Sequence, residues 1–300
     1  MIAVDWGSSS LRAYLLDGSG TVLDRRRSSD GALSCAGRFG KVLAALLADW
    51  DDPLVVMAGM VGARGGWIEV PYVRCPADTR ALAEGMLRLD GSRDAPGLAR
   101  RSLWCVPGMA DHATAVGDVM RGEETQVAGL LEALGPGSHT LCLPGTHSKW
   151  VRVREGAIVH VSTAMTGELY GLLRTHSILG RGMPEGEQVL DVEAFDAGLE
   201  CSDDPASGLL HDLFGVRTAS LFGRFTATSL PSYLSGVLIG HELQSALAGL
   251  PAPVHLVGSE ALVERYAHAL EARGIAALRH PEDLAAAGMY RLAKARGLLG

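Results

Sequence analysis

Cysteine is scarce in this sequence, and its five residues show no spacing typical of a metal site or a disulfide framework. None lies in a C-x-x-C pair, and they are widely separated: Cys35, Cys75, Cys105, Cys142 and Cys201. An odd number of scattered cysteines is not the pattern of a small secreted domain or of a zinc knuckle. The ten histidines contain no H-E-x-x-H motif either, so the sequence indicates no zinc site.

Long apolar runs and an excess of positive charge are also absent. The longest apolar run, residues 54–63, is much shorter than the ~20 residues of a membrane-spanning helix. Asp5 lies where a signal peptide would be apolar. The 27 Lys and Arg residues against 34 Asp and Glu residues give a net charge of −7, which does not suit binding to a phosphate backbone. We therefore expect a cytoplasmic protein that binds neither membranes nor nucleic acid.

Several common catalytic motifs are missing as well. The sequence contains no G-x-x-x-x-G-K-[ST] phosphate loop, no G-x-G-x-x-G dinucleotide motif and no G-x-S-x-G nucleophile elbow. Residues 146–149 imitate S-x-x-K only loosely, because Thr146 stands where a nucleophilic serine is needed. A serine hydrolase is therefore not indicated.

Glycine, in contrast, is abundant, with 38 residues in a chain of 300 that is 47% hydrophobic. This composition is typical of a globular chain whose backbone turns sharply or approaches something closely. Alternating apolar residues near the start predict three short strands joined by hairpins, and an α/β pattern follows. The periodicity places helices at 80–89, 119–134 and 259–273, and buried strands at 54–60 and 254–257.

An internal repeat is the most informative feature. DWGSSSLRAYLLDG, residues 5–18, aligns without a gap with LPGTHSKWVRVREG, residues 143–156. Gly7 pairs with Gly145 and Gly18 with Gly156, in each case 138 residues apart. Both copies read as a strand, a turn of glycine and hydroxyl residues, and a returning strand. Either two unrelated hairpins share turn chemistry, or the chain contains two homologous sheets.

Turns of this composition suit the binding of phosphate. They present backbone N–H groups and hydroxyls without bulky side chains, so two of them can hold one polyphosphate between them. Asp5, directly before the first turn, could bind Mg²⁺, which prefers one or two carboxylates together with phosphate oxygens. A purely structural hairpin remains the simpler explanation for each turn taken alone.

Motifs along most of the chain resemble the 2-dehydro-3-deoxygalactonokinases, sugar-acid kinases of the actin/hexokinase/Hsp70 superfamily. The resemblance rests on DWGSSSLRAYLLD, GMVGARGGWIEVPYVRCPA, DVMRGEETQVAGLL, LPGTHSKWV, TAMTGELYGLLRTHSILGR and AAAGMYRLAKARGLL. It implies ATP and Mg²⁺ as cofactors and two phosphate loops. The first contains Asp5, Gly7, Ser8, Ser9, Ser10 and Arg12, and the second contains Gly145, Thr146, His147, Ser148 and Lys149. LVGSEAL then resembles a nucleotide-contacting turn at Gly258, although Ser259 follows where the superfamily often has a second glycine.

A carboxylate that accepts the proton of the acceptor hydroxyl is the next requirement of a sugar kinase. Glu123 and Glu124 lie one turn before Val127 on the apolar face of the predicted helix 119–134, so both lean toward the interior. Acidic residues are also common in a first helical turn, where they complement the helix dipole. The resemblance favours Glu123, because related sugar kinases have Gly-Asp at this helix start. Glu124 and Asp111 remain alternatives.

The acceptor is expected to bind at GARGGWIEVPY, residues 62–72. Arg64 lies among glycines and can offer a carboxylate two parallel hydrogen bonds, while Trp67 and Tyr72 can form an aromatic wall. Arg121 is the second candidate for reading the carboxylate.

These observations predict an α/β chain with the two-domain, actin-like ATPase fold and its active site in the interdomain cleft. We expect domains at 1–112 and 113–300, and consider that the last helix returns to the first domain. The expected activity is ATP-dependent phosphorylation of 2-dehydro-3-deoxy-D-galactonate at its terminal hydroxyl. A kinase for a related sugar or sugar acid, and a nucleotide-switched chaperone or filament protein, are the alternatives. The partners are a small sugar acid and ATP, and we also consider a homodimer.

Overall fold

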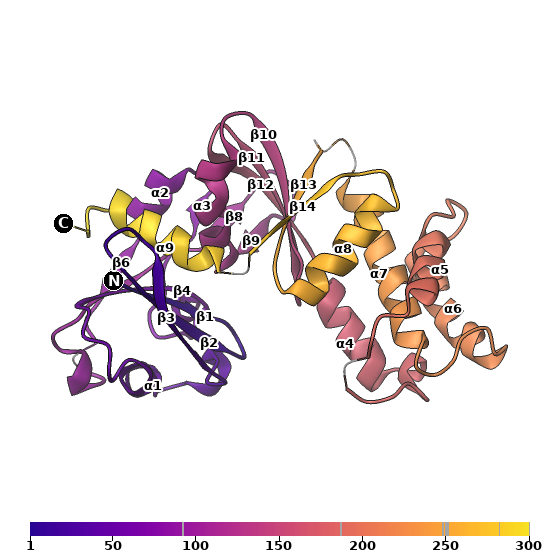
Figure 1. Cartoon of the computed structure of the whole chain (residues 1–300), viewed down its shortest axis with the longest axis horizontal. Coiled ribbons are helices and arrows are strands. Elements are labelled where there is room, and N and C mark those ends of the chain that lie inside the picture. Colours follow the sequence, from indigo (N-terminus) through magenta and orange to yellow (C-terminus); the bar gives the residue numbers. More distant parts are fainter. Residues whose placement is uncertain (92, 187, 248, 250–251, 282, 300) are drawn as a thin grey trace. The chain divides into compact units, whose positions relative to one another are not determined.

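The computed structural model of the chain describes residues 1–91, 93–186, 188–247, 249, 252–281 and 283–299. The chain divides into two compact units. Unit 1 comprises Met1–His139, Val151–Val161 and Pro281–Gly300, and unit 2 comprises Thr140–Trp150 and Ser162–His280. The elements of each unit can be followed by their labels in Figure 1.

The main sheet of unit 1 has six strands in the order β3-β2-β1-β4-β7-β6. These strands are β1 (Ile2–Trp6), β2 (Leu11–Leu16), β3 (Val22–Ser28), β4 (Leu54–Gly59), β6 (Leu87–Leu89) and β7 (Ser102–Cys105). β1 pairs in antiparallel fashion with β2 and in parallel with β4, which itself pairs in parallel with β7. Every residue of β4 is buried, as expected for an apolar strand with parallel neighbours on both sides.

Helix α1 (Phe39–Leu46) contributes to the core of this sheet. Phe39 and Leu43 are buried in one cluster with Trp6 and Met57, and the rings of Phe39 and Trp6 meet edge to face at 5.3 Å. Short elements complete unit 1: helix α2 (Thr79–Glu84) and a three-stranded sheet of β5 (Val73–Arg74), β8 (Met109–Asp111) and β9 (Asp118–Met120). Helices α3 (Glu123–Leu134) and α9 (Leu284–Ala295) belong to the same unit.

A second sheet has five strands in the order β12-β11-β10-β13-β14. They are β10 (Ser138–Leu143), β11 (Ser148–Arg154), β12 (Ala157–Ala164), β13 (Val254–Val257) and β14 (Ala277–His280). β13 pairs in parallel with both β10 and β14. The order β12-β11-β10-β13 repeats β3-β2-β1-β4, and β10 ends at Leu143 just as β1 ends at Trp6. The strand order therefore agrees with the two homologous sheets that the repeat predicts.

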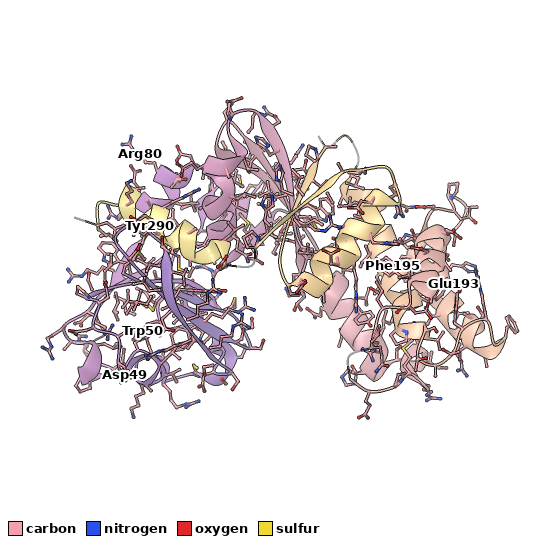
Figure 2. All side chains as sticks on the ribbon, in the orientation of Figure 1. Asp49, Trp50, Arg80, Glu193, Phe195 and Tyr290 are labelled. Carbon is pink, nitrogen blue, oxygen red and sulfur yellow. The ribbon has the colours of Figure 1, made fainter. Side chains whose placement is uncertain are left out.

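Unit 2 is rich in helices, which are α4 (Thr166–His176), α5 (Val192–Ser202), α6 (Leu209–Leu221), α7 (Leu230–Ala246) and α8 (Glu260–Glu271). Helix α7 is buried over most of its length and packs against α5, α6 and α4. In Figure 2, Phe195 marks the buried side of α5, while Glu193, two residues earlier, is exposed. Within the described ranges, no helix has the length and apolarity that crossing a membrane requires.

Two predicted helices differ from the observed elements. The helix predicted at 119–134 begins only at Glu123, because residues 118–120 form β9 and Gly122 has a φ of 114°, which is incompatible with a helix. The helix predicted at 80–89 ends at Glu84, since Leu87–Leu89 pair with β7 as β6. The helix predicted at 259–273 is observed as α8.

The division into units also differs from the boundary expected at residue 112. Helix α3 belongs to unit 1, where it packs against α9, and α9 in turn packs on β1, β4 and α2. Tyr290 of α9 donates a 2.6 Å hydrogen bond to the carbonyl oxygen of Gly18, and Arg291 lies 2.9 Å from Glu132 of α3. These contacts attach the C-terminal helix to the first sheet.

Two glycines allow α3 and α9 to approach closely. A Cβ atom on Gly288 would overlap the carbonyl oxygen of Thr125, and one on Gly129 would overlap the carbonyl oxygen of Leu284. The two helix backbones therefore touch where the side chains are smallest.

We expect Gly288→Ala to destabilise the protein by about 2 kcal/mol or more, because one helix must move away from the other. Gly171→Ala is the matched control, since Gly171 lies in α4 and a Cβ atom added to it would meet no other atom within 4 Å. Alanine there should be neutral or stabilising by up to about 1 kcal/mol. Urea unfolding measures both, and equal effects would contradict close packing at Gly288.

Candidate active site

The first glycine turn, between β1 and β2, is held by backbone hydrogen bonds. The N–H of Gly7 donates to the carbonyl oxygen of Ser10 at 2.9 Å. The carbonyl oxygens of Gly7 and Ser8 accept from the N–H groups of Ala32 and Leu33. Residues 8–10 are exposed, so the turn presents its serines to solvent on a fixed backbone.

Asp5 and Arg12 lie opposite one another in the register of β1 and β2. Both side chains are half-buried, and directly opposed residues project from the same face of a sheet. An acidic and a basic side chain therefore lie together beside the first turn. A carboxylate at this position fits Mg²⁺, which takes one or two protein carboxylates and completes its shell with water and phosphate oxygens.

Gly59, the last residue of β4, lies between the first turn and the start of α3. Its φ of 92° and ψ of −149° are accessible to glycine and strained for other residues. A Cβ atom there would lie 2.6 Å from the carbonyl oxygen of Trp6, and a Cβ on Gly122 would lie 3.4 Å from the Cα of Gly59. Trp6, which precedes the turn, and Gly122, which precedes Glu123, therefore both contact Gly59.

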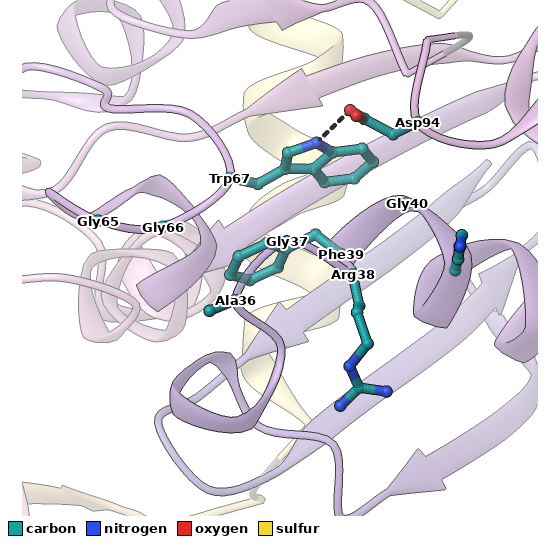
Figure 3. Close-up of a pocket in the computed structure, with 10 residues that line it drawn as sticks. Ala36, Gly37, Arg38, Phe39, Gly40, Gly65, Gly66, Trp67 and Asp94 are labelled. Atoms are coloured by element: carbon teal, nitrogen blue, oxygen red, sulfur yellow. Dashed lines mark hydrogen bonds between the residues drawn. The ribbon is translucent and has the colours of Figure 1, made fainter.

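The predicted acceptor loop, residues 62–72, begins three residues after this glycine. Arg64 is exposed and makes no hydrogen bond or ion pair within the part of the chain that the structure describes. Trp67 is fixed, because its indole N–H donates to Asp94 at 2.7 Å and its ring stacks on Phe39 at 6.2 Å. Figure 3 shows this stack. A cavity of about 260 Å³ lies there, and its lining also includes Gly65, Gly66, Arg38 and Lys41.

Arg121 is part of the wall of this loop. Its guanidinium lies 4.2 Å from the ring centroid of Tyr72 and donates to the carbonyl oxygen of Val70 at 2.7 Å. Its Nε and Nη1 atoms are buried and have no hydrogen-bond partner among the described residues. Arg121 thus connects the acceptor loop to the start of α3, and two of its guanidinium nitrogens have no partner among the described residues.

The three candidate bases have different surroundings. Glu123 is half-buried, and its Oε2 accepts a 3.0 Å hydrogen bond from the backbone N–H of Arg121. Glu124 is fully buried; its Oε2 accepts from the N–H of Gly122 at 2.7 Å, and its Oε1 has no partner among the described residues. Burial, and next the charge of Glu123, raise the pKa of Glu124 to about 8. Only Glu123 of this pair is open to solvent.

Asp111 is occupied by contacts to a neighbouring strand. Its Oδ2 accepts from the N–H of Val161 at 2.9 Å and lies 2.6 Å from Nδ1 of His160, while Oδ1 accepts from the N–H of Ala113. Burial opposes ionisation of this carboxyl group, but these donors outweigh it and keep the pKa of Asp111 below its usual value. Asp111 therefore joins β8 to β12 as a structural carboxylate.

The second glycine turn, in unit 2, is held by the start of α4. The N–H of Glu168 donates to the carbonyl oxygen of Thr146 at 2.9 Å, and the Glu168 side chain pairs with His147. Gly167 is required here, because a Cβ atom would overlap the carbonyl oxygen of Gly145. Thr146 and His147 are exposed, as a phosphate-contacting turn requires.

Ser148 and Lys149 are instead buried within unit 2. The Ser148 hydroxyl lies 2.9 Å from that of Tyr266, and Nζ of Lys149 donates to Thr163 at 2.9 Å. Their side chains pack inside unit 2 beneath the turn, so a bound phosphate could contact these two residues only through their backbone.

A buried carboxylate, Glu242 of α7, organises this support. It accepts hydrogen bonds from Trp150 Nε1 at 2.8 Å, from Tyr266 OH at 2.7 Å and from the hydroxyl of Thr166. Burial raises the pKa of Glu242, while these three donors and Ser148 oppose that shift. The donors come from β11, α8 and α4, so one carboxylate ties together the elements around the second turn. Sequence inspection missed it, because an isolated glutamate in an apolar helix gives no local signal.

Gly258, directly after β13, has the position in the second sheet that Gly59 has at the end of β4 in the first. A Cβ atom on Gly258 would lie 3.3 Å from the carbonyl oxygen of Pro144, the counterpart of Trp6 in the repeat. Nearby is a largely apolar cavity of about 90 Å³, lined by Gly145, Gly167, Leu262, Arg265 and Tyr266 among others. In each sheet, therefore, the residue before the glycine turn packs against a glycine at the end of the neighbouring parallel strand.

Duplicated sheets with paired glycine turns are the arrangement of the actin-like ATPase fold. The chain matches a family model described as 2-keto-3-deoxy-galactonokinase over residues 5–292, and it belongs to that family.

Relatives of similar sequence agree with this family. A 2-dehydro-3-deoxygalactonokinase of Escherichia coli (strain K12) is 38% identical over 280 residues, which is 91% of this chain and 90% of the relative. The protein named DgoK1 of Rhizobium meliloti (strain 1021) is 40% identical over 281 residues, 91% of this chain and 89% of its own.

Solved structures agree on the fold. A protein from Sinorhizobium meliloti, described as a 2-dehydro-3-deoxygalactonokinase, superposes with a TM-score of 0.88 at 37% identity and covers 98% of this chain and 96% of its own. An activator of 2-hydroxyisocaproyl-CoA dehydratase from Clostridium difficile has a TM-score of 0.54 at 13% identity over 99% of this chain and 96% of its own, and shares the fold alone.

The raised pKa of Glu124 makes stability depend on pH. Folded Glu124 keeps a proton that the unfolded chain releases above the ordinary value of 4.5, so this residue lowers stability as the pH rises from 4.5 to about 8. Compared with wild type, Glu124→Gln should gain up to about 1.4 kcal/mol of unfolding free energy per pH unit in this window. Urea unfolding at pH 5 and pH 8 measures the difference, and a constant difference would contradict the raised pKa.

Proposed function

We propose that this chain transfers the γ-phosphoryl group of ATP to the C6 hydroxyl of 2-dehydro-3-deoxy-D-galactonate, in galactonate catabolism. The observation that carries the proposal is the family match over residues 5–292. It is supported by the contacts of Gly59 in unit 1, which bring the residue before the first phosphate turn close to the residue before the half-buried Glu123.

The triphosphate is proposed to contact both glycine turns. Residues 7–10 supply exposed serines and backbone N–H groups from one copy of the repeat, and residues 145–149 supply exposed Thr146 and His147 and further backbone from the other. Arg12 lies close enough to the first turn to neutralise a phosphate oxygen. Asp5 would hold Mg²⁺, which when bound neutralises charge on the phosphate oxygens. Gly258, which packs against the backbone of Pro144, is proposed to contact the nucleotide.

The acceptor's carboxylate is proposed to pair with Arg64. Its guanidinium is exposed and carries no internal partner in the described ranges, whereas that of Arg121 is packed on Tyr72 and bonded to Val70. An ionised acceptor needs such a cation to offset the loss of its water, and a guanidinium can meet it through two parallel hydrogen bonds. Trp67, Tyr72 and Arg121 then shape the wall that contacts the sugar chain.

Glu123 is proposed as the general base. Its carboxylate can take the proton of the C6 hydroxyl as that oxygen attacks the γ-phosphorus and the bond from phosphorus to the bridging oxygen of ADP breaks. The hydrogen bond from the Arg121 N–H orients this carboxylate at the start of α3. Glu124 is too deeply buried for this role, and its charge is suppressed at neutral pH.

ADP release measured with a panel of acceptors tests the function itself. We expect 2-dehydro-3-deoxy-D-galactonate to give the highest kcat/KM, above its C4 epimer, unrelated sugar acids and neutral sugars. Arg64→Ala should raise KM for the acid by about 10- to 150-fold, as expected for the loss of a charged hydrogen bond, with KM for ATP nearly unchanged. A neutral sugar as best substrate, or ATP turnover indifferent to any acceptor, would reject the proposal.

Replacing the base tests the mechanism separately. Glu123→Gln should lower kcat by about 10²- to 10⁴-fold with little change in KM for ATP, because only the proton acceptor is lost. Glu124→Gln is the matched control and should retain most of the activity at pH 7. Steady-state kinetics of both variants decide the assignment, and the reverse ranking would move the base to Glu124.

A further inference from the structure

Helix α6 of unit 2 is apolar on two faces. Toward the interior, Val216 and Ala219 are buried, and Leu209 and Leu213 pack against the same cluster as α5 and α7. Figure 1 shows α6 beside those helices at the edge of the unit. A helix at a surface normally has a polar outer face, so a second apolar face is unusual.

The outer face carries four residues in one line. Leu210 is 86% exposed, Phe214 56% and Leu221 61%, and Arg217 lies between the last two. Their separations of four, three and four residues keep them on one side of a helix. This is the spacing of the a and d positions along a coiled-coil seam.

The spacing of the line is the same in both directions. Reversed about its centre, Leu210 exchanges with Leu221 and Phe214 exchanges with Arg217. Two copies of the helix that run antiparallel therefore place each leucine against a leucine and each arginine against a phenylalanine ring. Leucine pairs bury apolar surface, and a guanidinium over an aromatic ring is a favourable contact.

We propose that α6 is an interface between two copies of this chain, packed antiparallel around a twofold axis between residues 215 and 216. Leu210 of one copy contacts Leu221 of the partner subunit, and Phe214 contacts Arg217 of the partner subunit. This pairing is isologous, so it closes on itself as a dimer.

Arg217 favours an antiparallel arrangement of the two helices and a second copy of this chain as the partner. Its guanidinium has no hydrogen bond or ion pair within the described residues, although it lies in an apolar line. A parallel pair would set Arg217 against its own copy and repel, whereas the antiparallel pair gives it an aromatic ring. The residue types brought into opposition, Leu with Leu and Phe with Arg, suit a second copy of the same helix.

The length of α6 limits the area that two copies can bury against each other, and therefore the affinity of the dimer. Thirteen residues of helix span about 20 Å, and Phe222, 83% exposed at the end of α6, extends the apolar surface. An interface of this size is small for a stable complex, so we expect a dimer that dissociates on dilution through about the micromolar range.

Sedimentation velocity over a range of concentrations tests the interface on the full chain. Wild type should shift from monomer to dimer with concentration, and Leu210→Glu should remain monomeric. Leu23→Glu is the matched control, because Leu23 is 63% exposed in unit 1, and it should dimerise as wild type does. A wild type that is monomeric throughout, or a Leu210→Glu variant that still dimerises, overturns the proposal.

A charge swap tests the register and does not depend on the folding of one variant. Phe214→Arg should weaken the dimer at least tenfold, because it opposes two arginines, and Arg217→Phe should not. The double variant Phe214→Arg/Arg217→Phe should recover the wild-type association. The pair Leu210→Cys/Leu221→Cys should form an intermolecular disulfide under mild oxidation, as neither single variant does. No recovery in the swap, or cross-linking by a single variant equal to that of the pair, contradicts this register.

Discussion

The close backbone contact at Gly59 is the constraint on which the site in unit 1 depends. No side chain fits between Gly59 of β4 and the carbonyl oxygen of Trp6, the residue before the first phosphate turn, and Gly122, the residue before Glu123, lies in van der Waals contact with Gly59. Backbone contacts of this kind leave little freedom, and a carboxylate that must reach an acceptor hydroxyl benefits from such rigidity. The acceptor loop, residues 62–72, begins three residues after Gly59.

Unit 2 achieves a comparable rigidity by different chemistry. The elements around its glycine turn are joined by the buried carboxylate of Glu242, which accepts three hydrogen bonds. In unit 1 the corresponding contact is the backbone contact at Gly59. A buried charge is costly unless it is fully hydrogen-bonded, so Glu242 also specifies the positions of its partners. The repeat preserved strand order and turns, while each copy acquired its own means of holding the turn.

The sequence was sufficient for features that have local or periodic signals. The offset of 138 residues anticipated the matching strand orders, and the all-apolar segment at 54–59 anticipated a buried central strand. The sequence was insufficient where residues far apart in the chain determine the structure. Residues 87–89, expected as the second half of a helix at 80–89, instead pair with β7 as a strand. The start of α3 is determined by the positive φ of Gly122. The burial of Ser148 and the role of Glu242 depend on residues about 100 positions apart, which no local pattern encodes.

The attachment of α9 to the first sheet has a consequence for how the chain folds. The hydrogen bond between Tyr290 and Gly18 spans 272 positions, and that between Arg25 and Asp283 spans 258. Unit 1 therefore cannot be completed when its own strands have been synthesised, since the surface of β1 and α3 that α9 covers must wait until all of unit 2 has emerged from the ribosome. Loop closure over such distances is slow, so the face of unit 1 that α9 covers is among the last parts of the core to form.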